Sequence, residues 1–194
     1  MREIIKMIVV LSVICSVSGY VLATLKEATK GQIEEQVLTY VQGPALLSVL
    51  TDNDNDPIAD RRKLEVEGRE TPVTVFPSIK DGKLVAVAME SFGIGYSGDV
   101  GVMVGFDVTE DRLLGIGITT QTETPGIGDA ILRPDFTNQF LDHGFEKLAY
   151  NSKGGDLDAI SGATYSSAGT MEAVQKAVGL YGKIKDQILS AWKS

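Results

Sequence analysis

The chain has 194 residues, and its 26 acidic against 18 basic side chains give a formal net charge of −8 at neutral pH. Its 43% hydrophobic and 23% charged content suits one folded domain with an attachment. The longest basic run is Arg61-Arg62-Lys63, which gives no support to nucleic-acid binding. The single cysteine, Cys15, excludes an internal disulfide and a cysteine-based zinc or iron–sulfur site.

An uncharged apolar segment, residues 7–25, lies near the N-terminus. At about 1.5 Å per residue, a helix of this length covers the roughly 30 Å hydrocarbon core of a bilayer. We therefore expect a transmembrane anchor, with residues 1–6 in the cytoplasm. A cleaved signal peptide is the competing interpretation, because Arg2 and Lys6 precede the apolar run and small residues occur at 17–19. Both interpretations place the rest of the chain on the extracytoplasmic side.

Residues 26–70 predict a helical linker followed by a polar turn. Apolar residues recur at helical spacing until Gly43-Pro44. Asp52, Asp54 and Asp56 then imitate the first ligands of a calcium loop. Pro57 and Lys63 occupy the positions of the required glycine and glutamate, so we expect a solvated turn and no metal site. The apolar residues of the linker helix are Ile33, Val37, Tyr40 and Val41.

From residue 71 the apolar period changes to two, which predicts strands. Asp81-Gly82 joins the first two strands as a tight hairpin, and residues 109–112 join the second two. Short turns between consecutive strands imply an antiparallel sheet. We expect an α+β fold, in which this sheet and packed helices form a domain of residues 71–194. The four predicted strands are residues 72–80, 83–90, 100–108 and 113–120.

Two glycine-rich segments adjoin these strands. Residues 93–98 match the dinucleotide-binding string G-x-G-x-x-G, but a strand follows them where that fingerprint requires a helix. We interpret them as a connection that lies near a ligand. Residues 121–129 contain Pro125-Gly126, typical of a type II turn, and form either a ligand-contacting loop or a plain turn. His143 has no catalytic neighbours in motif spacing and is interpreted as a surface residue.

The segment 158–167 combines small residues with the start of a long amphipathic helix, predicted over residues 168–192. Small side chains admit a ligand to the backbone, and free amides at a helix start attract anions, so a phosphate fits here. An ordinary Ser/Thr helix cap is the alternative. The apolar face of the helix comprises Met171, Val174, Val178, Tyr181, Ile184 and Ile188.

Three blocks, residues 95–107, 123–128 and 158–166, together resemble the FMN-binding G subunit of the Rnf electron-transport complex, the RnfG/RsxG family. They resemble more distantly the C subunit of the sodium-pumping NADH:quinone reductase. Two positions depart from the family pattern. Gln121 stands where a histidine is frequent, so an imidazole role there does not transfer, and Ser166 replaces a frequent threonine while keeping a hydroxyl.

The resemblance implies one FMN per chain, attached by a flavin transferase through its phosphate to the hydroxyl of Thr164. Thr164 is then a tether, and no residue of the chain is expected to be catalytic or to bind a metal. Glu123 is expected to tune the flavin by its charge, and Tyr96 to pack on its ring. The further expected contacts are Ser161, Gly162, Ala163, Thr124, Gly126, Gly128 and Ser166.

The implied function is that of a single-pass electron-transfer subunit in the inner membrane. The complex would couple ferredoxin–NAD electron transfer to Na⁺ or H⁺ translocation, together with further membrane and peripheral subunits. This chain alone is not expected to pump or catalyse. The alternatives are a flavin carrier of another membrane reductase and an anchored extracytoplasmic binding module without cofactor.

Overall fold

A computed structural model describes residues 2–192, and the chain divides into two units, Met1–Thr39 and Tyr40–Ser194. The first unit is helical: α1 spans Arg2–Gln36 and buries none of its residues. Helical structure continues through a π-helical segment, Val37–Gln42, into α2, Gly43–Val49. By length and composition, the resulting helix is able to cross a membrane. Pro44 directly follows the π-helical segment, and a proline within continuous helical structure lacks the N–H that would bond to the preceding turn.

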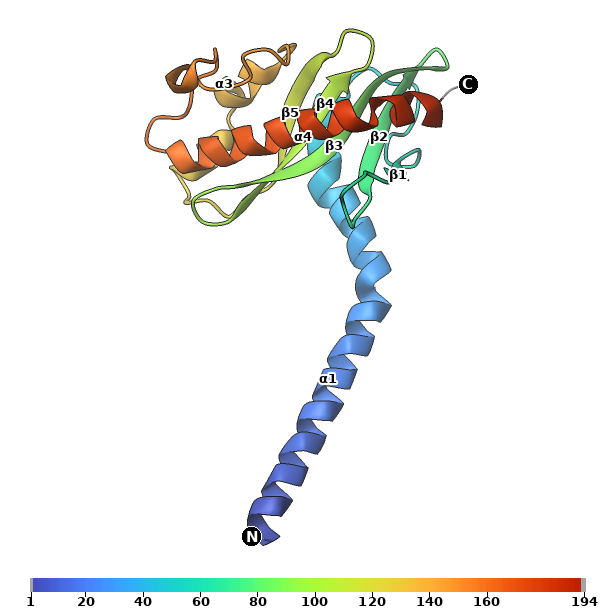
Figure 1. The fold of residues 1–194 in the computed structure, drawn as a ribbon, viewed down its shortest axis with the longest axis vertical. Coiled ribbons are helices and arrows are strands. Elements are labelled where there is room, and N and C mark those ends of the chain that lie inside the picture. Colours follow the sequence, from blue (N-terminus) through green and yellow to red (C-terminus); the bar gives the residue numbers. More distant parts are fainter. Residues whose placement is uncertain (1, 193–194) are drawn as a thin grey trace. The chain divides into compact units, whose positions relative to one another are not determined.

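The second unit is built on a five-stranded antiparallel sheet in the order β1-β2-β3-β4-β5, which confirms the predicted fold class (Figure 1). Neighbours in sequence are neighbours in the sheet, as the short turns predicted. The three-residue β1 escaped prediction because it is too short to show a period. The strands are β1 Arg62–Leu64, β2 Val73–Lys80, β3 Lys83–Ile94, β4 Asp99–Asp107 and β5 Arg112–Thr120.

The predicted hairpin turn between β2 and β3 is present. Asp81 and Gly82 have φ values of 50° and 73°, the left-handed conformation that a two-residue hairpin with the native twist requires. Gly82 meets this requirement without strain, and aspartate tolerates it better than most residues.

Helices cover both faces of the sheet. On β4, Gly105 and Phe106 point to opposite faces because side chains alternate along a strand. A Cβ on Gly105 would lie 2.0 Å from Val49 Cγ1, so α2 packs closely on that face. On the other face Phe106 stacks on Tyr181 of α4, with ring centroids 4.5 Å apart.

Helix α4, Thr164–Ala191, is the long C-terminal helix of the unit and starts four residues earlier than predicted. Of its predicted apolar face, Met171, Val174, Tyr181, Ile184 and Ile188 are buried and Val178 is partly buried. Close packing against β3 depends on two glycines. A Cβ on Gly93 would lie 1.9 Å from the carbonyl oxygen of Gly169, and one on Gly169 would lie 2.7 Å from the Ile94 carbonyl oxygen.

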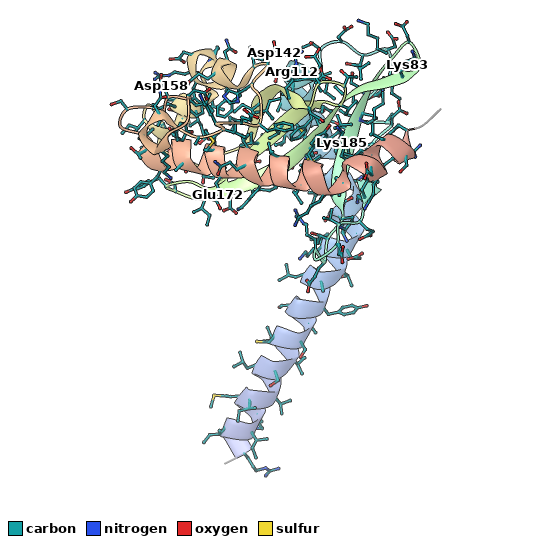
Figure 2. All side chains as sticks on the ribbon, turned by 45° about the horizontal axis from the view of Figure 1, so that its top comes forward. Lys83, Arg112, Asp142, Asp158, Glu172 and Lys185 are labelled. Carbon is teal, nitrogen blue, oxygen red and sulfur yellow. The ribbon has the colours of Figure 1, made fainter. Side chains whose placement is uncertain are left out.

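Four short helices connect β5 to α4. They are η2 Gly128–Leu132, α3 Pro134–Thr137, η3 Asn138–Phe140 and η4 Asn151–Lys153. Arg112 at the start of β5 pairs with Asp142 in this connection and lies 2.8 Å from Glu110 (Figure 2). His143 lies on the same connection, where its Nε2 is 2.7 Å from Asp156.

The aspartates of the polar turn bind protein groups. Asp54 accepts a hydrogen bond from the Asp81 amide, Asp56 caps the amide of Ile58, and Asp52 pairs with Lys80. Within residues 2–192, no group of three or more His, Cys, Asp or Glu residues is placed to hold a metal ion.

Candidate functional site

The start of α4, the connection between β3 and β4, and the loop after β5 meet around a cavity of about 330 Å³. These are the three segments that the sequence singled out. The cavity is lined by Tyr96, Glu123, Thr124, Ile127, Gly128, Gly162, Ala163, Thr164, Tyr165 and Ser166.

The loop leading into α4 is fixed from several sides. Gln139 accepts a hydrogen bond from the Asp158 amide at 2.7 Å and donates one to its carbonyl oxygen at 3.3 Å. The Asn151 side-chain amide donates to the Asp158 carboxylate at 2.6 Å. Gly162 then turns the chain with a φ of 81°, which a residue with a Cβ adopts only under strain. The cavity wall at 162–163 is therefore small and preorganised.

The first turn of α4 leaves backbone donors free. Ala163 is the N-cap residue and makes no side-chain cap, so the alternative of an ordinary Ser/Thr cap does not apply here. Within residues 2–192, the amides of Thr164, Tyr165 and Ser166 have no acceptor. These amides and the helix dipole favour an anion at this helix start. Thr164 is exposed beside them.

Tyr150 and Ser167 hold the same turn from the core side. The Tyr150 hydroxyl donates to the Ser167 carbonyl oxygen at 2.6 Å, and the Ser167 hydroxyl accepts from the Ile160 amide at 3.0 Å. Burial raises the pKa of Tyr150, so its hydroxyl remains a donor at any physiological pH. The helix start is thus anchored independently of a ligand.

Glu123 is a buried carboxylate at the centre of the site, 4% exposed. It accepts hydrogen bonds from the amides of Tyr96 at 3.2 Å and Ser97 at 3.0 Å, and from the Ser166 hydroxyl. Burial alone would raise its pKa, but the hydrogen bonds from Ser166, Ser97 and Tyr96 outweigh burial and lower the pKa below the ordinary value. Glu123 is therefore ionised, and it ties the β3–β4 connection to α4.

Glycines make room for this carboxylate. A Cβ on Gly95 would lie 2.5 Å from Glu123 Oε1, and one on Gly128 would lie 2.7 Å from Glu123 Cβ and from Ser166 Oγ. The amides that follow Gly95 serve a protein carboxylate, and β4 follows them. Both observations agree with the rejection of a dinucleotide fingerprint in residues 93–98.

Backbone hydrogen bonds within the loop after β5 stabilise its turn. The Thr124 carbonyl oxygen accepts hydrogen bonds from the amides of Ile127 at 3.2 Å and Gly128 at 2.9 Å. Gly126 has a φ of 77°, as the predicted type II turn requires. The side chain of Gln121, at the position where histidine is frequent in the family, accepts from the Glu123 amide at 2.7 Å. Gln121 therefore supports the loop.

Two exposed aromatic rings stand at the mouth of the cavity. Tyr96 is 71% and Tyr165 is 68% exposed, and their ring centroids lie 6.0 Å apart at an interplanar angle of 50°. Large exposed aromatic side chains beside a cavity are typical of ligand sites.

The structure brings eight of the ten expected contact residues to the cavity, while Ser161 and Gly126 lie outside its lining. Ile127 and Tyr165 line it but were not expected. Tyr165 had a sequence signal, because an aromatic residue directly follows the threonine of the third block.

Comparison with known proteins agrees with this geometry. Residues 95–179 match the family model of the FMN-binding domain. The chain is 30% identical over 180 residues to the G subunit of an ion-translocating oxidoreductase complex from Methanosarcina acetivorans, covering 91% of this chain and 94% of that protein. It is also 30% identical over 183 residues to the G subunit of such a complex from Cereibacter sphaeroides, covering 90% and 82%. The crystal structure of Shewanella oneidensis NqrC shares the fold, with a TM-score of 0.53, 20% identity, and coverage of 71% of this chain and 75% of that one.

The fold and the site thus define an FMN-binding protein. More particularly, the chain belongs to the family of G subunits of ion-translocating oxidoreductase complexes, as the resemblance in its three blocks indicated.

Proposed function

We propose that the chain is the FMN-carrying electron-transfer subunit of a membrane-bound, ion-translocating oxidoreductase complex. One observation carries this proposal. The exposed Thr164 stands at the free amide end of α4, on the wall of a cavity within the segment that matches the FMN-binding domain.

The residues present fit an FMN phosphate. The amides of Thr164, Tyr165 and Ser166 would receive its oxygens, and Gly162 and Ala163 add no bulk beside them. A phosphoryl bond to the Thr164 hydroxyl would leave one negative charge next to the positive end of the helix dipole. Such an attachment would prevent loss of the flavin outside the cytoplasm, where a dissociated flavin could not be replaced from the cellular pool.

The cavity volume of about 330 Å³ lies within the range of small-molecule sites. We expect Tyr96 and Tyr165 to flank the ring and to leave one edge open to a redox partner. Glu123 would position the β3–β4 connection, and its effect on the flavin is moderated by the three donors that bind its carboxylate. When bound, FMN accepts and releases the electrons.

The N-terminal helix would anchor the chain in the cytoplasmic membrane, with the folded unit on the extracytoplasmic side. Residues 7–25 carry no charged side chain, whereas ion pathways through membranes normally contain ionisable residues. Ion translocation, of Na⁺ or H⁺, therefore belongs to other subunits, and a ferredoxin–NAD couple remains the expected source and sink of electrons. A flavin transferase would load the cofactor.

Purification of the tagged full chain from its native membrane tests this assignment. We expect several multi-span subunits and a flavin that is reduced when the complex receives its low-potential donor. A flavin-loaded chain that purifies with a different reductase would support the carrier alternative. A flavin-free chain would support the binding module and contradict the proposal.

A further inference from the structure

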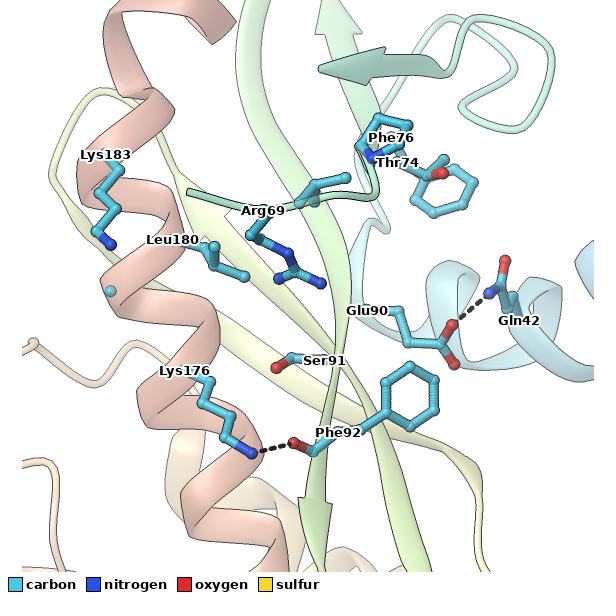
Figure 3. Close-up of a pocket in the computed structure, with 13 residues that line it drawn as sticks. Gln42, Arg69, Thr74, Phe76, Glu90, Ser91, Phe92, Lys176, Leu180 and Lys183 are labelled. Atoms are coloured by element: carbon cyan, nitrogen blue, oxygen red, sulfur yellow. Dashed lines mark hydrogen bonds between the residues drawn. The ribbon is translucent and has the colours of Figure 1, made fainter. Parts of the chain in front are cut away.

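A second cavity of about 700 Å³ lies in the folded unit and shares no lining residue with the site at Thr164 (Figure 3). It exists because two strands diverge. Strand β2 pairs with β3 from Lys80↔Lys83 to Val75↔Met89, whereas β3 continues along β4 as far as Ile94↔Asp99. Beyond Met89, β3 therefore has no strand on its β2 side.

Side chains of α4 close this gap incompletely. Lys176 donates to the Phe92 carbonyl oxygen at 3.1 Å, and Glu172 accepts from the Ile94 amide at 3.1 Å. These two side chains therefore provide hydrogen-bond partners for backbone groups of β3 that no neighbouring strand pairs. One turn further along α4, Gly179 contributes no side chain, and nothing lies within 4 Å of the position of its missing Cβ. The space between β3 and α4 is therefore left open.

Three cations line this cavity. Lys176 lies 2.8 Å from Glu172, and the other two, Arg69 and Lys183, have no ion-pair partner within residues 2–192. The one carboxylate of the lining, Glu90, receives hydrogen bonds from Gln42 and Thr119. Figure 3 shows it directed toward Gln42, while Arg69 and Lys176 extend into the gap between β3 and α4. Positive charge thus faces this gap in a chain whose net charge is −8.

Ser91 places a further hydrogen-bond donor in the cavity. Its residue surface is only 6% exposed, yet its hydroxyl opens on the cavity and has no hydrogen-bond partner within residues 2–192. The hydroxyl is therefore free to bond to a ligand there. In Figure 3 the hydroxyl points into the gap between Arg69 and Lys176. A phosphoryl group in this cavity would find hydroxyl, guanidinium and ammonium donors in its lining.

We propose that this cavity binds a phosphate-bearing ligand with an apolar body. Arg69, Lys176, Lys183 and the Ser91 hydroxyl would hold the phosphoryl group, since guanidinium and ammonium donors suit phosphate oxygens. Val73, Phe92 and Leu180 supply the apolar part of the lining. The volume exceeds the needs of an inorganic ion and lies within the range of small-molecule sites. Lipid headgroups and soluble phosphate esters share this chemistry.

Calorimetry on the full chain in neutral detergent tests the proposal with four probes. These are inorganic phosphate, glycerol 3-phosphate, dihexanoyl phosphatidic acid and dihexanoyl phosphatidylcholine. We expect saturable binding of an anionic probe, weakened about tenfold or more in Arg69→Gln/Lys183→Gln, because each removed cation takes a charge-assisted hydrogen bond with it. Binding of the anionic lipid but not of glycerol 3-phosphate identifies a lipid headgroup. Equal affinities for phosphatidic acid and glycerol 3-phosphate would show that an apolar body adds nothing and would overturn that part of the proposal.

The matched control is Lys83→Gln/Lys153→Gln, which removes the same charge outside the cavity; Lys83 lies at the β2–β3 turn (Figure 2). The proposal is overturned if no anionic probe binds, if phosphatidylcholine binds as tightly as phosphatidic acid, or if the control weakens binding equally. Circular dichroism of each variant confirms that it is folded. Flavin attachment at Thr164 is measured on the same samples, so failure of this proposal is distinguishable from failure of the proposed function.

Discussion

The Ser166 hydroxyl, in the first turn of α4, donates a hydrogen bond to the buried carboxylate of Glu123, 43 residues earlier in the chain. The same carboxylate accepts the amides of Tyr96 and Ser97. One ionised side chain therefore joins the three segments that surround the candidate flavin site, and the shape of the site depends on its charge.

Glu123→Gln tests this role through pH dependence. The pKa of Glu123 in the folded state lies below its ordinary value of 4.5, so its charge stabilises the fold above that pH. This contribution is lost as the pH falls through the lower, folded-state pKa. We expect the variant to be about 1–3 kcal/mol less stable than the parent at pH 7, with the difference shrinking as the pH falls through the folded-state pKa. Guanidinium unfolding at pH 7 and at a series of lower pH values measures it.

Glu146→Gln is the matched control, because Glu146 is exposed and has no partner within residues 2–192. A pH-independent loss of stability in Glu123→Gln would show that the carboxylate acts by its shape and not by its charge.

The glycines between β3 and α4 give a second prediction. Gly169→Ala places a Cβ 2.7 Å from the Ile94 carbonyl oxygen and should destabilise the folded unit by about 1–3 kcal/mol. Gly182→Ala, in the same helix, meets nothing within 4 Å and should stabilise it by up to about 1 kcal/mol through helix propensity. Thermal unfolding of both variants measures the contrast. Equal effects would argue against the close approach of α4 to β3.

The aromatic pair gives a third prediction. In Thr164→Ala no phosphoryl bond to this residue forms, so the affinity for free FMN reports only non-covalent contacts. Adding Tyr96→Ala or Tyr165→Ala should weaken that affinity by about 2- to 10-fold, the range expected for loss of one aromatic contact. Flavin fluorescence titration measures it. Tyr40→Ala, which removes an exposed tyrosine outside the cavity, should leave the affinity unchanged. If FMN affinity is equal in all variants, neither tyrosine ring contacts the bound flavin.

Local patterns predicted much of the fold. The alternation of residues 72–120 and the Asp81-Gly82 turn act over short distances, and the sheet follows them strand by strand. The stripe of α4 likewise predicted its buried face. β1 was missed because three residues carry no period. The folded unit begins at Tyr40, since α2 packs on the sheet, a tertiary contact that the helical spacing of the linker does not reveal.

The sequence predicted which segments form the site but not the hydrogen bonds that hold them together. The three blocks named the segments that meet, but the partners of Glu123 lie 26 to 43 residues away and become known only from the packing. Gln139 and Asn151, which support the 158–163 loop, lie 19 and 7 residues before Asp158, and these contacts too follow from the packing. The cavity at Ser91 arises from the divergence of two strands, which no local pattern encodes.

Peptide mass spectrometry tests the central claim most directly. The full chain is expressed with its flavin transferase, denatured and digested. We predict that the peptide containing Thr164 carries the mass of one FMN less one water, that Thr164→Ala abolishes the increment, and that Ser161→Ala, three residues away, retains it. An unmodified Thr164 peptide in the parent chain, or an increment that persists in Thr164→Ala, would contradict the account.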